Sequence, residues 1–234
     1  MDSIKPGGLA VVIGSTGGIG EALVQALKAS GSFAEVKGFS RGSEPDIDLL
    51  DEQTIMRVAQ DLSRTGHDVR LVFDATGFLH GCGFKPEKTL AALDPGHMAH
   101  SFAVNAIGPA LLMKHFLPLL PKQGKSVFAT LSAKVGSIGD NALGGWYSYR
   151  ASKAALNQFV HSAAIELARK NPEAVCVALH PGTVDTGLSS GFAKSGLDVR
   201  TPPEAAALLL GVLDQLDPSQ TGGFFDYKGD VLPW

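Results

Sequence analysis

Short apolar runs alternate along the whole chain with longer stretches in which apolar residues recur at helical spacing. The short runs are rich in β-branched residues and have the length of buried strands, whereas the longer stretches are typical of helices that bury one face. The pattern predicts strands at 9–13, 36–40, 69–75, 126–132, 175–179 and 223–227. It predicts helices at 18–30, 52–65, 97–120, 148–170 and 203–216.

Strands that alternate with helices in this way are typical of βαβ units, which build a parallel sheet. The strand runs are nearly continuously apolar, as expected where helices cover both faces of the sheet. We therefore predict one α/β domain over 1–234: a doubly wound Rossmann fold of about seven parallel strands with helices on both faces. The segment 183–200, rich in glycine and small polar residues, is expected to form a lid over the substrate.

Composition narrows the class of protein. Hydrophobic residues make up 44% of the 234 residues and charged residues only 18%, against a usual charged share of about 25%, so the chain buries much of itself in a core or between subunits. The net charge of −3 and the lack of a Lys/Arg-rich run give no reason to expect nucleic acid. No run reaches the roughly 18 apolar residues of a membrane span, so no membrane partner is expected.

The two cysteines, Cys82 and Cys176, lie far apart, and a disulfide framework is not expected. The chain has neither a CxxC pair nor an HExxH motif, so no metal site is predicted. The first residues do not resemble a secretory signal. Together these features lead us to expect a cytoplasmic protein in a reducing compartment.

The segment after the first predicted strand carries the first chemical signal. A glycine-rich loop, GSTGGIG at 14–20, joins that strand directly to a helix. In a doubly wound fold the pyrophosphate of a dinucleotide binds at this point, on backbone amides at the helix N-terminus. A flexible turn is the alternative. The residues predicted to bind the cofactor here are Gly14, Ser15, Thr16, Gly18, Ile19 and Gly20.

The end of the second predicted strand points to the kind of dinucleotide. In this fold an acidic residue there would bind the 2′-hydroxyl of the adenosine ribose, but the chain has Ser40 and Arg41. A guanidinium pairs with a 2′-phosphate through two hydrogen bonds. The sequence therefore favours NADP (NADPH) over NAD, with an ordinary solvent-facing arginine as the alternative.

Tyr149 and Lys153 lie four residues apart in the predicted helix at 148–170, which puts a phenol and an ammonium on one helix face. A free phenol has a pKa of about 10, and a cation held close to it lowers that value. A phenol tuned in this way can donate a proton to a carbonyl oxygen or accept one from an alcohol. Such a pair also occurs on ordinary solvated helices.

Taken in order, these motifs resemble the short-chain dehydrogenase/reductase family over nearly the whole chain, and the stretch 135–156 and Trp234 resemble its small C-factor-like and sniffer-like carbonyl reductases. Beyond the glycine loop and the Tyr-x-x-x-Lys pair, four further segments carry the resemblance: Asp48-Leu49-Leu50-Asp51, Asp74-Ala75-Thr76-Gly77, Phe102-Ala103-Val104-Asn105 and His180-Pro181-Gly182-Thr183-Val184-Asp185-Thr186.

The resemblance implies a reaction: hydride transfer between the nicotinamide and a small carbonyl or secondary alcohol. It implies that Tyr149 is the general acid/base, that Lys153 binds the nicotinamide ribose and lowers the pKa of Tyr149, and that Asn105 supports a proton-relay water. It places the cofactor against Asp48, Leu49, Ala75, Thr76, Gly77, Asn105, Tyr149, Lys153, Pro181, Gly182, Val184 and Thr186. The stretches 78–95 and 140–147 and the lid are expected to form the substrate pocket, without indicating which substrate.

Two positions depart from the family pattern. Asp74 replaces the first Asn of its segment, a position that is mainly structural in the family. More seriously, alignment on Gly136 puts Ala133 where the family has a Ser that hydrogen-bonds the substrate carbonyl, with Ser132 one residue earlier. A one-residue shift on a strand turns a side chain to the other face. We nevertheless expect Ser132 to supply the hydroxyl, with Ser137 as the substitute and a turn-capping role as the alternative for both.

Two expectations follow for the whole molecule. The helix at 148–170 is apolar nearly all round, and the helix at 97–120 is similar, which favours a homodimer, or a homotetramer built from it, through these helices. The second expectation concerns activity. Ala133 leaves open a dinucleotide-binding regulatory or signalling protein with little turnover as the alternative to an enzyme.

Overall fold

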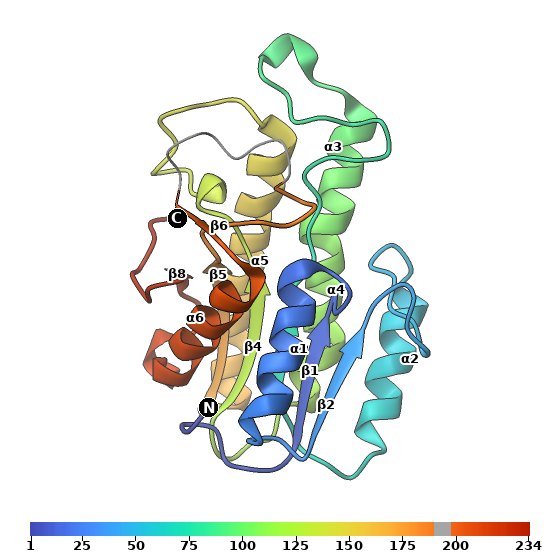
Figure 1. Cartoon of the computed structure of the whole chain (residues 1–234), viewed down its shortest axis with the longest axis vertical. Coiled ribbons are helices and arrows are strands. Elements are labelled where there is room, and N and C mark those ends of the chain that lie inside the picture. Colours follow the sequence, from blue (N-terminus) through green and yellow to red (C-terminus); the bar gives the residue numbers. More distant parts are fainter. Residues whose placement is uncertain (190–197) are drawn as a thin grey trace.

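Six apolar runs form a parallel sheet in the order β2-β1-β3-β4-β5-β8 (Figure 1). The fold is that of a computed structural model, in which residues 1–189 and 198–234 are described. The strands are β1 (Leu9–Ile13), β2 (Glu35–Phe39), β3 (Val69–Asp74), β4 (Ser126–Leu131), β5 (Ala174–His180) and β8 (Phe224–Asp226). Every neighbouring pair is parallel, so the carboxyl ends of all six strands lie at one edge of the sheet.

The predicted Rossmann fold is confirmed, with one strand fewer in the sheet than the approximate number expected. The segment at 40–51, between β2 and the next helix, contains no strand. Among the described residues no further strand pairs with β2, which forms one edge of the sheet. Two short strands, β6 (Thr183–Val184) and β7 (Val199–Arg200), pair with each other outside the sheet. They join the two ends of the predicted lid, whose residues 190–197 lie outside the described residues.

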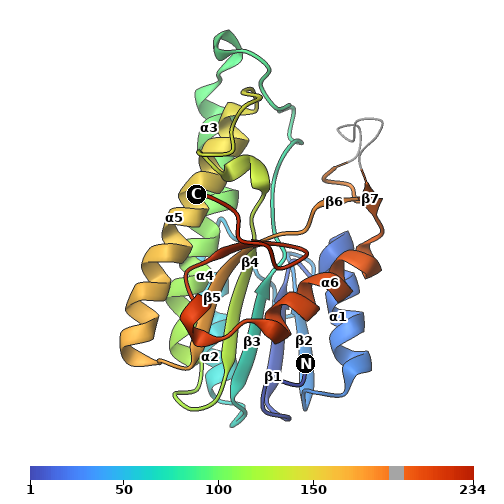
Figure 2. The same ribbon diagram turned by 90° about the vertical axis from the view of Figure 1, so that its left-hand side faces the viewer.

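Helices cover both faces of the sheet (Figure 2). Neighbouring side chains of β1 feed the two layers in turn, because successive residues of a strand point to opposite faces: Val11 belongs to one core and Val12 to the other. On one face lie α1 (Gly18–Ser30) and α6 (Pro202–Gln215), and on the other α2 (Glu52–Ser63), α4 (Gly108–Phe116) and α5 (Tyr147–Lys170).

The long helix predicted at 97–120 forms without a break but is not α-helical throughout. It consists of α3 (Pro95–Phe102), a π-helical turn (Ala103–Ile107) and α4. Such turns insert a residue into a helix and are frequent at functional sites, and this one contains Asn105. The stretch Pro95–Leu119 is long and apolar enough to cross a membrane by composition, but its inner side chains pack in the core beneath the sheet, and core helices pass the same test.

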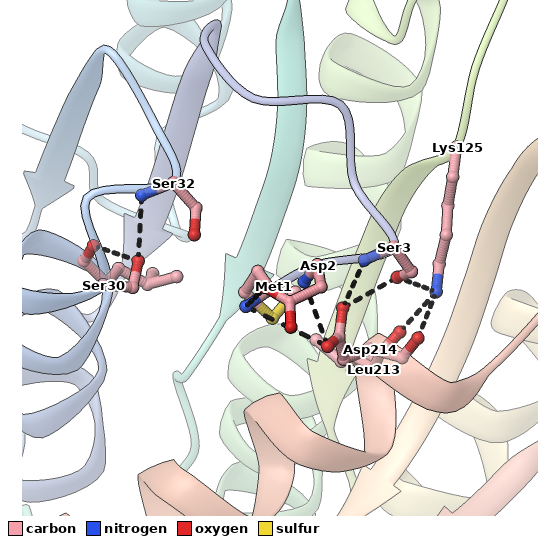
Figure 3. A network of polar contacts seen from close by, with 9 residues as sticks. Met1, Asp2, Ser3, Ser30, Ser32, Lys125, Leu213 and Asp214 are labelled. Carbon is pink, nitrogen blue, oxygen red and sulfur yellow. Dashed lines mark hydrogen bonds and ion pairs between the residues drawn. The ribbon is translucent and has the colours of Figure 1, made fainter.

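The amino edge of the sheet is held by a polar network (Figure 3). Lys125, just before β4, donates hydrogen bonds to Ser3 Oγ (2.7 Å) and to the carbonyl oxygens of Leu213 (2.7 Å) and Asp214 (3.0 Å). It thereby satisfies carbonyls at the end of α6. The Asp214 carboxylate in turn accepts from the amides of Asp2 and Ser3. These contacts fasten the N-terminus and α6 at the edge opposite the predicted site.

Candidate functional site

The glycine loop after β1 has the geometry of a phosphate cradle. Gly14 has a φ of +81°, a conformation that glycine adopts without strain. A Cβ at Gly20 would lie 2.1 Å from the Gly14 carbonyl oxygen, so only glycine lets α1 approach the loop this closely. Gly17 caps α1 without a side-chain hydrogen bond, and the first-turn amides that a helix cannot use itself therefore suit an anion.

Two further predicted segments meet this loop in space. A Cβ at Gly14 would lie 3.1 Å from the carbonyl carbon of Ala75 and from Cγ2 of Thr76, and one at Gly18 would lie 2.9 Å from Cγ2 of Thr186. The segments that follow β3 and β5 thus flank the loop after β1. The residues present fit a dinucleotide whose pyrophosphate lies on α1.

Ser40 and Arg41 follow β2 on the adenosine side of this cradle. Ser40 is buried, and its Oγ accepts a hydrogen bond from the Gly42 amide (3.2 Å). Arg41 is exposed. The serine therefore shapes the turn that presents the arginine where this fold brings the adenosine ribose.

Asp48 and Leu49 lie in the segment between β2 and α2. Asp48 Oδ1 accepts from the amide of Leu50 (3.0 Å), which fixes the carboxylate in its turn. Leu49 packs against the start of α4: a Cβ at Gly108 would lie 2.6 Å from the Leu49 Cβ. The glycine at 108 is what lets the two segments come together.

Tyr149 and Lys153 lie on the first turns of α5, 8% and 2% exposed. The Lys153 Nζ lies 6.0 Å from the centre of the Tyr149 ring and donates a hydrogen bond to the Leu131 carbonyl at the end of β4 (2.8 Å). A Cβ at Gly77 would lie 3.8 Å from the same Nζ. The structure thus brings the phenol, the ammonium and the segment after β3 together at the carboxyl edge of the sheet.

Burial dominates the protonation of both groups. It lowers the pKa of Lys153 to about 8, an effect that the charge of Asp74 partly offsets. It raises the pKa of the Tyr149 phenol well above its ordinary value. The lowering of the Tyr149 pKa expected from the sequence is therefore not found in the chain by itself, because desolvation of a phenolate outweighs an ammonium beside its ring.

The Asp74 carboxylate lies in a buried hydrogen-bond network, and its charge acts on Lys153. Its buried carboxylate accepts hydrogen bonds from the Thr76 amide (3.0 Å), the Thr76 hydroxyl (2.6 Å) and the Thr130 hydroxyl (2.6 Å). Burial raises the pKa of this carboxyl, and the hydrogen bonds and the charge of Lys153 oppose the rise. Its place at the carboxyl end of a core strand was the available signal, because ligands of parallel sheets bind there.

Asn105 fixes the backbone of Phe78, in the loop that follows β3. Its Oδ1 accepts from the Phe78 amide (2.7 Å), and its Nδ2 donates to the Phe78 carbonyl (2.8 Å) and to Ser152 Oγ (3.1 Å). The carboxamide is therefore committed to Phe78, which begins the stretch expected to line the pocket, and to Ser152, which the sequence analysis did not assign to the site. Ser152 directly precedes Lys153, which was the only signal for it.

The structure does not bring Ser132 to Tyr149. The Ser132 hydroxyl donates instead to Oδ1 of Asn157 on α5 (2.6 Å). Ala133 is extended (φ −145°, ψ 141°) and packs with Leu79 and Tyr149. Successive side chains of extended backbone point to opposite sides, which agrees with the Ser132 hydroxyl facing Asn157 while Ala133 packs with Tyr149.

Ser137, the expected substitute, is also engaged elsewhere. It is buried, and its Oγ accepts from the amide of Asp140 (3.1 Å), which is the turn-capping role given as its alternative. The methyl group of Ala133 therefore stands beside the phenol, where the family resemblance would place a hydroxyl.

Lys153 makes stability depend on pH. Its pKa is about 8 in the folded chain, against an ordinary lysine value of 10.5, so the folded chain releases this proton first and its stability rises with pH in that window. The free energy of unfolding of the wild type, relative to that of Lys153→Met, should rise between about pH 8 and pH 10 in urea titrations. Lys170→Met, at an exposed position, is the control and should show no shift. A difference that stays constant with pH for Lys153→Met would contradict the prediction.

Comparison with known proteins agrees with this geometry. A family model described as short chain dehydrogenase matches residues 8–195. The C-signal of Myxococcus xanthus is 39% identical over 147 residues, which cover 62% of this chain and 83% of that protein. The 1-hydroxy-2-glutathionyl-2-methyl-3-butene dehydrogenase of Rhodococcus sp. is 31% identical over 215 residues, 92% of this chain and 89% of that protein.

Solved structures share the fold. The NADPH-bound carbonyl reductase from chicken fatty liver has a TM-score of 0.85 at 24% identity, over 98% of this chain and 95% of that chain. The carbonyl reductase Sniffer of D. melanogaster has a TM-score of 0.83 at 24% identity, over 99% and 100%. Since the family match runs from the first strand past the fifth, the chain belongs to the short-chain dehydrogenase/reductase family and is an NAD(P)-dependent oxidoreductase.

Proposed function

We propose that the chain is an NADP-dependent reductase of small carbonyl compounds, working in reverse on secondary alcohols, with Tyr149 as its general acid and base. The observation that carries the proposal is the burial of Tyr149 next to Lys153 at the carboxyl edge of the sheet. Two ionisable groups in an apolar setting are costly for stability, and such groups cluster at functional sites.

When bound, the cofactor supplies a hydride or accepts one at its nicotinamide ring. The loop at 14–20 would hold the pyrophosphate on the amides of α1. Gly77, Pro181 and Gly182 would line the nicotinamide side, with Lys153 donating to the ribose. These residues orient the reacting carbon, and orientation is a large part of what such a site contributes.

Tyr149 carries the proton in this proposal. Its raised pKa keeps the phenol protonated at neutral pH, the state in which it can donate from Oη to the substrate oxygen as a carbonyl is reduced. The Lys153 ammonium then stabilises the phenolate that is left. In the reverse direction the phenolate takes the proton of the alcohol.

A second candidate is a dinucleotide-binding regulatory protein with little turnover, and Ala133 is the observation that favours it. A methyl group cannot hydrogen-bond the substrate oxygen, and losing one such donor lowers the rate by about 10²–10³ in other enzymes. The retained Tyr149 and Lys153 favour the enzyme.

Turnover separates the two candidates. We expect purified protein to oxidise NADPH with members of a panel of aldehydes, ketones and quinones. Tyr149→Phe should lower kcat by at least about 100-fold, because the proton donor is lost, with the Kd for NADPH little changed. Equal rates in both proteins would remove Tyr149 from the mechanism. No turnover across the panel, with NADPH still bound, would favour the regulator.

The same assay tests what Ala133 costs. Ala133→Ser places a hydroxyl beside the phenol and should raise kcat by about tenfold or more if a missing donor limits the rate. Ala133→Val adds bulk without a donor and is the matched control. A rise in both variants would point to packing instead of hydrogen bonding.

The proposal of NADP rests on Arg41, and the NADPH of the chicken carbonyl reductase supports it. Arg41→Ala should weaken NADPH binding by about tenfold or more, the usual effect of losing a charge-assisted hydrogen bond, and leave NADH binding unchanged. Fluorescence titration measures both constants. Arg64→Ala, an exposed arginine on the far end of α2, is the control. An equal loss for both cofactors would argue against contact with the 2′-phosphate.

We further propose a homodimer, or a homotetramer built from it, through α4 and α5. Phe159 and Ile165 on α5 are 42% and 47% exposed, and Ile107 before α4 is 51% exposed. Apolar rows on adjacent helices suit a two-fold interface. Size-exclusion chromatography with light scattering at micromolar concentration should give at least twice the mass of the chain, and a monomer would end the proposal.

A further inference from the structure

The helix that carries Tyr149 and Lys153 begins without a cap of its own. Trp146, the residue before α5, has left-handed backbone (φ 51°, ψ 42°) and makes no side-chain capping hydrogen bond. The first amides of a helix have no partner within it, and an uncapped first turn tends to fray. At this helix the first turn contains Tyr149.

Glu87 supplies the missing cap from the loop between β3 and α3. Its Oε2 accepts from the Ser148 amide (3.2 Å), and its Oε1 accepts from the Ser148 hydroxyl. Its backbone carbonyl accepts from the Trp146 amide (2.5 Å). Glu87 is 4% exposed and Ser148 fully buried, so water does not compete for these contacts. A carboxylate also interacts favourably with the positive end of the helix dipole.

His97 on α3 holds the carboxylate from the other side. Its Nδ1 lies 3.2 Å from Glu87 Oε1, within reach of a favourable electrostatic interaction with the carboxylate. The imidazole stacks on Phe84, with centroids 4.9 Å apart, and meets the edge of Phe78 at 6.1 Å. Phe78 is the residue whose backbone Asn105 holds. The loop at 78–95 is thus tied to both helices of the site.

The charge state of Glu87 agrees with this arrangement. Burial by itself raises the pKa of the carboxyl, but hydrogen bonds from Ser148 and the charge of His97 oppose the rise and bring the pKa below its ordinary value. The group is therefore an anion at neutral pH.

We propose that Glu87 is a positioning residue for the reaction: through Ser148 it fixes the first turn of α5, and with it the hydroxyl of the adjacent Tyr149. The inference rests on the proposed function, because the placement of the phenol matters only if the phenol transfers the proton. Proton transfer requires the donor within hydrogen-bond distance of the substrate oxygen, and a displacement of about 1 Å can lower a rate by about 100-fold. A frayed first turn would allow such a displacement.

The test compares two variants of Glu87 in the NADPH oxidation assay. Glu87→Ala should lower kcat by about tenfold to 100-fold and leave the Kd for NADPH unchanged, because in the described part of the chain Glu87 accepts its hydrogen bonds from Ser148 and Trp146. Glu87→Gln keeps an oxygen that accepts from the Ser148 amide and should recover most of kcat. Glu166→Gln, an exposed carboxylate on the same helix paired with Lys170, is the matched control and should behave as the wild type.

Ser148→Ala keeps the test valid if Glu87→Ala does not fold. It removes the hydroxyl but not the backbone amide, so kcat should fall by about threefold to tenfold with unchanged NADPH affinity. Where Glu87→Ala folds, the losses from Ser148→Ala and Glu87→Ala should be non-additive in the double variant, because both substitutions remove the contact between these two residues.

Three outcomes decide against the inference. Wild-type kcat in Glu87→Ala, or in Ser148→Ala where Glu87→Ala does not fold, would overturn it, while loss of turnover in Tyr149→Phe leaves the proposed function standing. A parallel fall of kcat and NADPH affinity, without recovery in Glu87→Gln, would mean a role in folding only. Equal rates in the wild type and Tyr149→Phe would remove the proposed function and this inference together.

Discussion

The buried ammonium of Lys153 is the group around which the site is organised. An ammonium taken out of water destabilises a protein unless other groups replace its hydration. The Leu131 carbonyl does so directly at 2.8 Å, and the charge of Asp74 adds to it. These groups lie at the carboxyl ends of the adjacent strands β4 and β3. The register of the two strands therefore places both groups where they stabilise the Lys153 ammonium. The same burial that lowers the pKa of Lys153 raises that of Tyr149. At neutral pH the phenol is therefore protonated, and the amine beside it is still mostly an ammonium.

The loop after β3 is attached at two points to the helices that carry the site residues. It is attached first through Phe78 to Asn105, in the π-helical turn between α3 and α4, and then through Glu87 to the start of α5. An inserted residue in a helix redirects side chains, and here it presents the Asn105 carboxamide to the backbone of the loop. The attachment through Glu87 is buried and the one through Phe78 is partly buried, so the loop and the two helices are held as one unit and the phenol has few ways to move.

Ala133 separates this chain from the family pattern more than any other residue of the site. The family resemblance expects a hydroxyl close to the phenol, but Ala133 is extended and the neighbouring Ser132 hydroxyl hydrogen-bonds Asn157 instead. Alternation along an extended chain leaves no partial solution, because a shift of one residue moves a side chain to the opposite side. In the mechanism proposed above, Tyr149 therefore bears more of the stabilisation of the substrate oxygen than in a site with two hydroxyl donors.

The pattern of residues was enough to predict the approximate positions of most strands and helices, the glycine-rich loop after β1 and the family. Local signals suffice there: apolar periodicity sets the strands and helices, and glycines at 14 and 20 are required by positive φ and by close approach. The tertiary structure decided the direction of the Ser132 hydroxyl, the sign of the Tyr149 pKa shift and the cap of α5. Each depends on burial or on contacts across the fold, such as Ser132 with Asn157 or Glu87 with Ser148, 25 and 61 residues apart. Desolvation and side-chain direction are properties of the packed molecule, and no local pattern of residues encodes them.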